Sequence, residues 1–340
     1  MSNSNGSHRG DRGLHAPSGP VLGGVEPVGG VRFTPVRVVL QTLGLLIGLG
    51  LLGWALSLAL DEGNRASIEA LRRAPADRVA LLLGLSVAGL VLNGAMFWAV
   101  LRPLRRLALL DVMLVNAMAT ALSVLPFKLG LLTRVLVHHR RDGVRFKDLL
   151  AWIAAMGALA LAVLLPLGLA SAWRGRVDGL WWLVALGGAV VCSGAGVALG
   201  RISARAPVLR RLSLGADAIV RDWRPVLAHL ALRLADVGLL AARFAVASSI
   251  VGYAMGPDRA VLFATTYFLL SVLAPAGTLG FREMGVAALG WAGEDDERAL
   301  ALVALVVSAA ELLSAFVVAL GGWARIRPDR LLLRRARTPE

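Results

Sequence analysis

The chain has 340 residues, of which 57% are hydrophobic and only 17% are charged, and its mean hydropathy is +0.70. About a quarter of the residues of a soluble domain are charged, so this composition excludes an ordinary soluble protein. The net charge of +14 comes from 36 basic and 22 acidic residues. The basic residues form short clusters between long apolar runs, as in the cytoplasmic loops of membrane proteins, and this distribution argues against nucleic-acid binding.

Residues 1–36 are rich in Gly, Ser and Pro, and we expect them to form a disordered cytoplasmic tail. Six apolar runs follow, each long enough to cross a hydrocarbon core of about 30 Å as one helix. They are 38–60, 79–101, 149–173, 179–200, 226–251 and 299–324. The first run is too long for the core of a signal peptide, so we expect it to remain in the mature protein. The sequence therefore predicts an all-α polytopic membrane protein with six full crossings.

Two further apolar segments, 113–137 and 261–291, are interrupted near their middle by proline and glycine. All the basic clusters face the cytoplasm only if the first segment enters and leaves the membrane from that side. By the same reasoning the second segment enters and leaves from the other side, with the acidic loop 294–297 outside and the basic tail 325–340 inside. We therefore predict two re-entrant broken-helix hairpins. The alternative is that proline and glycine merely kink two ordinary helices.

The predicted membrane domain, 37–324, divides into two halves, 37–173 and 179–324. Each half has two crossings, one re-entrant hairpin and a final crossing, and the halves begin on opposite sides of the membrane. This is an inverted-topology repeat, in which paired broken segments indicate a transporter-type site near the midplane. The predicted hinge residues are Pro126, Gly130, Pro275, Gly277 and Gly280. We expect both termini to lie on the cytoplasmic side of an inner membrane.

Three motifs connect the sequence to a known family. They are Asn116 followed by Leu125-Pro126-x-x-x-Gly130-x-x-x-Arg134, then Arg233-x-x-Asp236, and finally Pro275-x-Gly277-x-x-Gly280-x-x-Glu283. With them, residues 38–324 resemble the lysylphosphatidylglycerol synthase transmembrane region, also called the flippase-like integral membrane family. The resemblance implies a protein that handles phospholipids or polyprenyl-linked lipids. Members often have Glu directly after the glycine of the first motif, whereas this chain has Leu131, so a proton- or cation-linked role does not carry over there.

Ionisable side chains inside the apolar segments are the candidate functional residues, because each costs about 2.5–3.5 kcal/mol at mid-membrane depth. The candidates for binding an anionic lipid headgroup are Lys128, Arg134, Arg233 and Arg282. The candidates for a supporting role are Asn116, Asp236, Arg243, Glu283 and Glu311. Arginine suits a phosphate because its planar guanidinium donates two parallel hydrogen bonds.

Each candidate also has a purely structural interpretation. Arg233 and Asp236 are three residues apart on a helix, where they can neutralise each other without a ligand. Arg134 and Arg282 can instead anchor their helices at the membrane interface. Glu311 lies near mid-membrane in its run and needs a partner, for which we predict Arg243.

Other patterns are weaker. The sequence Gly48-Leu49-Gly50-Leu51-Leu52-Gly53 matches a dinucleotide fingerprint but lies in an apolar crossing, where small residues at four-residue spacing, such as Gly44 and Gly48, indicate close helix packing. His138 and His139 indicate a basic interface, and the acidic residues 294–297 lack the spacing of a calcium loop. We therefore expect no metal and no cofactor. Residues 202–223 mix basic and apolar residues and predict an amphipathic helix on the cytoplasmic leaflet.

Two functions remain open. The first is a lipid translocase with membrane lipids as its partners, and the second is a non-catalytic membrane partner of a lipid or cell-envelope biosynthesis system. Members that synthesise aminoacylated lipids carry a soluble catalytic domain after the membrane region, and only 16 residues follow Ala324, so we expect no enzyme activity. A lipid-modifying enzyme encoded separately is a candidate partner. The lipid, the energy coupling and the oligomeric state are left open by the sequence.

Overall fold

The computed structural model describes residues 35–123, 129–206, 213, 215–274, 278, 280–292 and 296–327. These residues form helices and no strand, which confirms the all-α prediction. The helices are α1 (Pro35–Ala59), η1 (Glu62–Asn64), α2 (Arg65–Arg72), α3 (Ala76–Leu101), α4 (Leu109–Leu122), α5 (Leu129–Arg140), α6 (Phe146–Arg174), α7 (Gly179–Ser203), α9 (Asp217–Val220), α10 (Trp223–Val251), α11 (Pro257–Leu273), α12 (Phe281–Ala292) and α13 (Glu297–Ile326).

Six of these helices are long and apolar enough to cross a membrane, namely α1, α3, α6, α7, α10 and α13. They coincide with the six predicted crossings, which are thereby confirmed. A helix of 25 to 30 residues is about 38–45 Å long, enough for the hydrocarbon core and part of the headgroup region. Large apolar side chains cover the outer surface, for example Leu183 and Val191 of α7 and Leu320 of α13. Such a surface is typical of contact with lipid tails.

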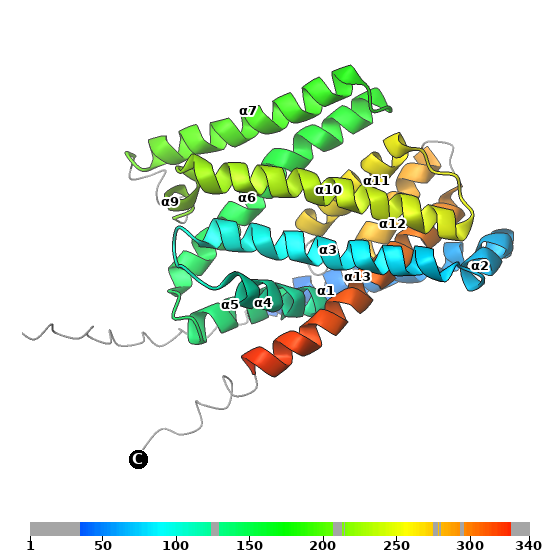
Figure 1. Cartoon of the computed structure of the whole chain (residues 1–340), viewed down its shortest axis with the longest axis horizontal. Coiled ribbons are helices and arrows are strands. Elements are labelled where there is room, and N and C mark those ends of the chain that lie inside the picture. Colours follow the sequence, from blue (N-terminus) through cyan, green and yellow to red (C-terminus); the bar gives the residue numbers. More distant parts are fainter. Residues whose placement is uncertain are drawn as a thin grey trace, which may run out of the picture.

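The long helices lie side by side, and the connections between them gather at two ends of the bundle (Figure 1). The α3–α4, α5–α6 and α9–α10 connections lie at one end, with most of the arginines that follow or precede the helices; we call this the basic end. At the opposite end, the side chain of Asn64 donates to the carbonyl of Arg298 at 3.2 Å, which joins the end of α1 to the start of α13. The backbone N–H of Val177 donates to Asp258 at 2.7 Å there and joins the α6–α7 connection to α11.

Helices α4 and α5 form an antiparallel hairpin whose open side lies at the basic end. Arg141, directly after α5, donates to Asp111 in the first turn of α4 at 2.6 Å. Asp111 also accepts from Arg325 of α13 at 3.0 Å. At the other end of the hairpin, a Cβ on Gly130 would overlap the carbonyl oxygen of Ala119, so this close approach requires glycine. The helices have 14 and 12 residues, about 21 and 18 Å, and neither alone spans a hydrocarbon core.

Helices α11 and α12 form the second broken segment, with α12 packed through Gly285 against Leu270 of α11. α12 has 12 residues and begins after Gly280, whose φ of +82° is a left-handed conformation that favours glycine. The predicted hinge residues Pro126, Pro275 and Gly277, and Lys128, lie outside the described residues. Re-entry of either hairpin, the inverted repeat and the cytoplasmic orientation of the basic end stay predictions.

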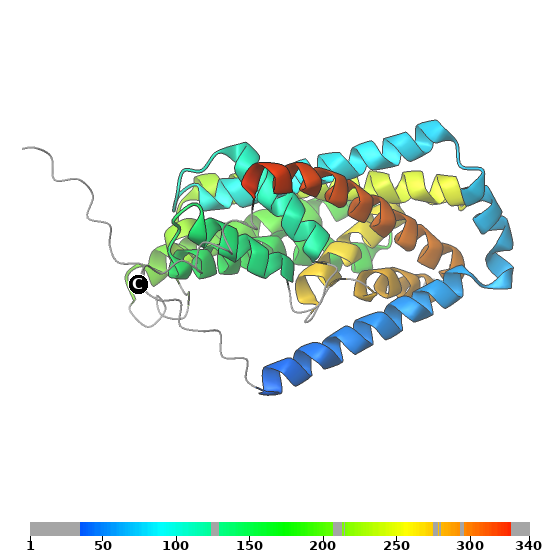
Figure 2. The ribbon, with the colours of Figure 1, turned by 90° about the horizontal axis from the view of Figure 1, so that it is seen from below.

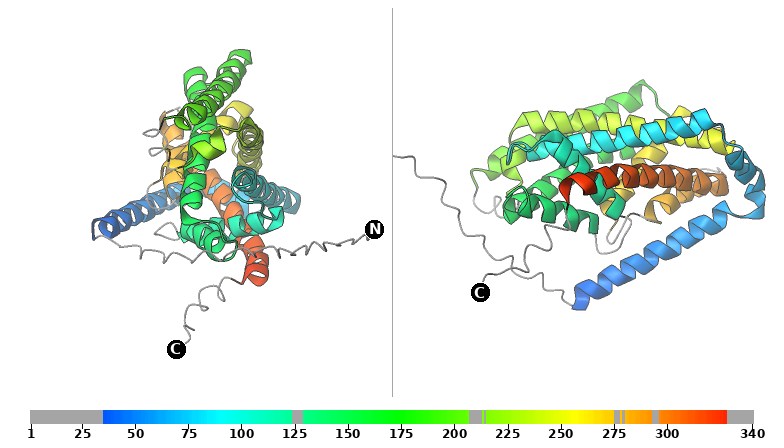
Figure 3. Two further views of the ribbon diagram at one scale, coloured as in Figure 1. Left: turned by 90° about the vertical axis from the view of Figure 1, so that its left-hand side faces the viewer. Right: turned by 60° about the horizontal axis from the view of Figure 1, so that its bottom comes forward.

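Helix α1 packs against the second hairpin through small residues. Its buried positions are Gly44, Gly48, Ala55 and Ala59, which confirms the predicted packing of the glycine motif. A Cβ on Gly280 would overlap the carbonyl oxygen of Gly48, so the two backbones are in direct contact. Figures 2 and 3 show α1 running obliquely along the bundle, with its N-terminal end standing away from the other helices.

The predicted amphipathic helix over 202–223 is wrong as one continuous element. Its described residues form the end of α7, turns, the four-residue α9, the turn at 221–222 and the first residue of α10. Gly215 has a φ of +89°, and a residue in this left-handed conformation cannot continue a right-handed helix. Of the predicted tails 1–36 and 325–340, residues 1–34 and 328–340 lie outside the described part of the chain. Residues 35–36 belong to α1 and residues 325–326 to α13, so both helices extend beyond the predicted tail boundaries.

Candidate functional site

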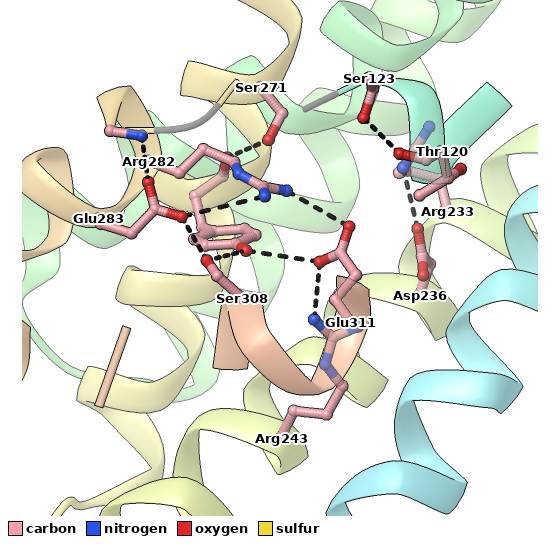
Figure 4. A network of polar contacts seen from close by, with 12 residues as sticks. Thr120, Ser123, Arg233, Asp236, Arg243, Ser271, Arg282, Glu283, Ser308 and Glu311 are labelled. Carbon is pink, nitrogen blue, oxygen red and sulfur yellow. Dashed lines mark hydrogen bonds and ion pairs between the residues drawn. The ribbon is translucent and has the colours of Figure 1, made fainter. Parts of the chain in front are cut away.

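Four helices bring ionisable side chains together around Glu311 of α13 (Figure 4). Its Oε2 accepts a hydrogen bond from Nη2 of Arg243 on α10 at 2.9 Å and from the hydroxyl of Tyr267 on α11 at 3.4 Å. Its Oε1 accepts from Nη1 of Arg282 on α12 at 3.3 Å. The predicted pairing of Arg243 with Glu311 is confirmed, and a second arginine shares the same carboxylate.

Glu283 reaches this cluster from the first turn of α12. Its Oε2 accepts from the backbone N–H of Gly280 at 2.7 Å, three residues earlier, as the acid of a capping box does. Its Oε1 accepts from the hydroxyl of Ser308 on α13. Ser308 Oγ lies 2.8 Å from the hydroxyl oxygen of Tyr267, so the second hairpin is hydrogen-bonded to α13 through fully or nearly buried groups.

Arg282 lies between two carboxylates and above an aromatic ring. Its hydrogen bond goes to Glu311, whereas the adjacent Glu283 Oε1 is 3.9 Å from Nη2. The guanidinium carbon lies 4.4 Å from the ring centroid of Tyr267, a cation–π distance. Arg282 and Glu283, although adjacent in the sequence, therefore do not form a closed pair with each other.

Arg233 and Asp236 form a second buried ion pair on α10. Nη1 of Arg233 donates to Oδ2 of Asp236 at 2.9 Å, as predicted from the three-residue spacing, and both side chains are buried. The pair lies next to the first cluster, because a Cβ on Gly89 would be 3.3 Å from Arg243 and 3.9 Å from Asp236. This part of the structure thus contains three arginines and three carboxylates, and their formal charges balance.

Arg134 on α5 is in a different environment. Its Nη2 donates to Oδ1 of Asn116 on α4 at 2.6 Å, and its guanidinium carbon lies 3.9 Å from the ring centroid of Phe97. Within the described residues no carboxylate lies within ion-pair distance of it. Nε of Arg134 and Nδ2 of Asn116 are both buried donors, and neither has a hydrogen-bond partner among the residues that the structure describes. In the part of the chain that the structure describes, the first hairpin therefore contains a cation without a counter-anion and two donors that make no hydrogen bond.

The structure brings the predicted site residues into two groups rather than one. Arg233, Asp236, Arg243, Arg282, Glu283 and Glu311 are contiguous, and Arg134 and Asn116 form a separate pair. Sequence reasoning missed Tyr267 and Ser308. A signal for each existed, because Tyr267 is one of only two tyrosines and Ser308 precedes Glu311 by three residues on the same helical face.

The two histidines of the discounted pair have separate partners. Nδ1 of His138 lies 2.7 Å from Oδ2 of Asp142, and its ring packs on Trp152. Nδ1 of His139 lies 2.9 Å from the carbonyl oxygen of Val144. Among the described residues no group of three His, Cys, Asp or Glu side chains converges as metal ligands do.

Six apolar spanning helices around a buried, charge-balanced cluster define a polytopic integral membrane protein. The chain belongs to the family described as Lysylphosphatidylglycerol synthase TM region, whose family model matches residues 41–321. Comparisons with curated proteins and with solved structures give no significant match. The family places the chain among membrane proteins of lipid-related processes, and the matched part is a membrane region rather than a soluble transferase domain.

Proposed function

We propose that this protein is a lipid translocase that binds the phosphate of an anionic phospholipid, or of a polyprenyl-phosphate-linked lipid, and moves it across the membrane. The observation that carries the proposal is the environment of Arg134: among the described residues its guanidinium has no carboxylate partner, and its own Nε and the Nδ2 of Asn116 are buried donors without an acceptor. A charge in such a place is costly unless it is paired. An anionic ligand would supply the missing pairing.

A phosphate matches the donors that this site offers. The guanidinium fork of Arg134 can donate two parallel hydrogen bonds to two phosphate oxygens, which a lysine cannot do. The free Nδ2 of Asn116 can donate a further one. The ring of Phe97 holds the guanidinium plane without competing for its protons. Lys128, six residues before Arg134 in the sequence, would add a second cation.

Arg233 of α10 and Arg282 of α12 offer a second place where the headgroup could bind. Arg282 and Arg233 lie at the charge-balanced cluster, where a headgroup must compete with carboxylates. A headgroup could then bind first at Arg134 and next at the cluster around Glu311, and would cross the apolar interior between these two polar places. We further propose an inner-membrane location with both termini cytoplasmic, and transport that runs on a gradient, on exchange or with a separately encoded lipid-modifying partner.

The test is leaflet scrambling in reconstituted liposomes, with labelled phosphatidylglycerol, phosphatidylcholine and polyprenyl phosphate as separate probes. Arg134→Gln removes charge-assisted hydrogen bonds worth about 1.5–3 kcal/mol each, so movement of the anionic probe should fall about tenfold or more. Asn116→Asp gives Arg134 a carboxylate partner of nearly the same size, and we expect the same loss for the opposite reason.

Arg102→Gln is the matched control. Arg102 is exposed at the end of α3 and stacks on Trp98 at 5.1 Å, so its loss removes the same charge and the same type of ring contact. We expect anionic-lipid movement within twofold of wild type. If well-folded wild type moves no probe above empty liposomes, the translocase proposal fails. The non-catalytic membrane-partner function, for which the balanced ion pairs suffice as structural links, would then be favoured.

A further inference from the structure

We propose that Glu311 is an internal anion that occupies a phosphate site formed by Arg243 and Arg282, and that a phosphate group displaces it as Glu311 takes up one proton. This inference rests on the proposed function, because it assigns the ligand chemistry and the regulation of the cluster around Glu311. It concerns binding, however, and can be tested without measuring translocation.

The geometry of Glu311 is that of a bound anion. Three donors from three helices converge on its two oxygens, Arg243 at 2.9 Å, Arg282 at 3.3 Å and Tyr267 at 3.4 Å. A phosphate oxygen pair has the same charge and similar spacing of acceptors. The arginines are fixed by packing, because a Cβ on Gly89 would meet Arg243 at 3.3 Å and the ring of Tyr267 lies against Arg282.

Among the three charged side chains of this site, Glu311 is the most exposed, and it is therefore the one that a ligand can displace. Its side chain is 21% exposed, whereas the side chains of Arg243 and Arg282 are 6% and 10% exposed. A ligand that approaches the arginines from the exposed side therefore meets Glu311 first. Both arginines also keep a buried Nε donor that has no partner in the described part of the chain, so they can serve more acceptor oxygens than the carboxylate provides.

Glu283 is the contrasting carboxylate of the same cluster. It is fully buried, caps the start of α12 through the backbone of Gly280 and accepts from Ser308. Its oxygens thus hold the helix terminus and the neighbouring helix, and only the 3.9 Å approach to Arg282 is an ion pair. Glu283 is the structural acid, and Glu311 is the exchangeable one.

Charge balance couples the exchange to a proton. The cluster has three arginines against Asp236, Glu283 and Glu311 and is formally neutral. A phosphodiester carries one negative charge, so its entry alone would leave a net charge of about −1 in an apolar interior, which is strongly unfavourable. When a hydronium ion or a buffer acid of the surrounding solution gives up one proton to the Glu311 carboxylate, its own bond to that proton breaks and an O–H bond forms on Glu311. The cluster then becomes +1, and the bound phosphodiester restores neutrality.

The neighbouring titratable groups determine the sign of the pH dependence. Among the described residues, those that face Glu311 are Arg243 and Asp236 of α10, Tyr267 of α11, and Arg282 and Glu283 of α12. Asp111 of α4 lies at the basic end, paired with Arg141 and Arg325. Because the phosphate-bound state holds one more proton, affinity should rise as pH falls, by up to about tenfold per pH unit.

The experiment is titration calorimetry on the full-length protein in phosphatidylcholine nanodiscs. The probes are dihexanoyl phosphatidylglycerol, dihexanoyl phosphatidylcholine and inorganic phosphate, each measured in buffers of different ionisation enthalpy so that protons taken up are counted. We expect wild type to take up about one proton per phosphatidylglycerol bound. In acidic buffer, where inorganic phosphate carries a single negative charge as a phosphodiester does, its binding with the same proton uptake would identify the free ion as a ligand. Binding of phosphatidylglycerol alone would identify a lipid headgroup.

Two matched variants separate the carboxylates. Glu311→Gln should bind the anionic probe about tenfold or more tightly and without proton uptake, because the competitor is gone. Glu283→Gln also gives the cluster one net positive charge, so charge balance no longer requires a proton, but Glu311 still occupies the two arginines and the gain in affinity should be smaller than that of Glu311→Gln. Wild type that binds without proton uptake, or Glu311→Gln that binds no more tightly, overturns the inference.

The wild-type proton count needs no variant, so it decides the matter even if Glu311→Gln fails to fold. Leaflet scrambling of the Arg134 variants is a separate measurement. Its failure with intact proton-coupled binding would refute translocation and leave the binding site, while the reverse result would refute the internal anion alone.

Discussion

Gly280 offers a quantitative test of how the second hairpin is held. It combines a left-handed φ of +82° with backbone contact to α1, since a Cβ there would overlap the carbonyl oxygen of Gly48 and lie 2.8 Å from the amide nitrogen of Leu52. Gly280→Ala forces a non-glycine residue into that conformation, at about 1–2 kcal/mol. It also overpacks a close backbone contact, at about 1–3 kcal/mol. We expect a loss of about 2–5 kcal/mol of unfolding free energy.

The assay is equilibrium unfolding in mixed micelles followed by far-UV circular dichroism. Gly53→Ala is the matched control. Gly53 is an exposed glycine on α1, the helix that Gly280 contacts, and a Cβ on Gly53 meets nothing within 4 Å. Alanine in a helix interior is favoured over glycine by up to about 1 kcal/mol, so the control should be neutral or more stable. If Gly280→Ala unfolds like wild type while Gly53→Ala behaves as expected, the described contact between α1 and the hairpin is not what holds it.

Two further predictions concern acid stability and topology. Arg174 and the α7 backbone hold the pKa of Asp178 below its ordinary value of 3.8. The stabilising effect of the Asp178 carboxylate is therefore complete at neutral pH and is lost as pH falls below about 4. Asp178→Asn should be less stable than wild type at pH 7, and the unfolding curves of the two proteins should converge at low pH. In a variant without its native cysteine, single cysteines at Arg105 and Lys147 should both react with an impermeant maleimide from the cytoplasmic side, and one at Glu62 from the other side. Labelling of Arg105 and Lys147 from opposite sides would exclude re-entry of the first hairpin.

Much of the fold follows from the sequence because the bilayer imposes a simple length rule. A crossing needs about 20 apolar residues, and the six runs that meet this rule became the six spanning helices. The helical spacing of Arg233 and Asp236 likewise predicted their contact, because residues three apart share a face. The Arg243–Glu311 pair could be predicted from the free-energy cost of an unpaired charge in the membrane, because two charges near mid-membrane each need a partner.

The sequence can single out candidate residues, but it does not fix the contacts that depend on helix rotation and on non-helical backbone. Glu283 caps its own helix because α12 begins after Gly280, and no composition rule gives that starting residue. Tyr267 and Ser308 join the cluster only because α11, α12 and α13 present particular faces to one another. The continuous amphipathic helix over 202–223 failed because hydrophobic patterning does not register the left-handed turn at Gly215.

The arginines of the two hairpins differ in whether a carboxylate lies beside them. In the second hairpin Arg282 is surrounded by Glu311 and Glu283, so its charge is compensated within the protein. In the first hairpin Leu131 stands where members of the resembling family often have glutamate, three residues before Arg134 and therefore on the same side of α5. A glutamate there could pair with Arg134, whereas leucine leaves the guanidinium to Asn116 and Phe97. If the proposed function holds, an anion that enters at the first hairpin would meet Arg134, which has no carboxylate partner among the described residues, and an anion that reaches Arg243 and Arg282 would have to displace Glu311. We therefore expect the two places to differ in affinity for the anion and in pH dependence.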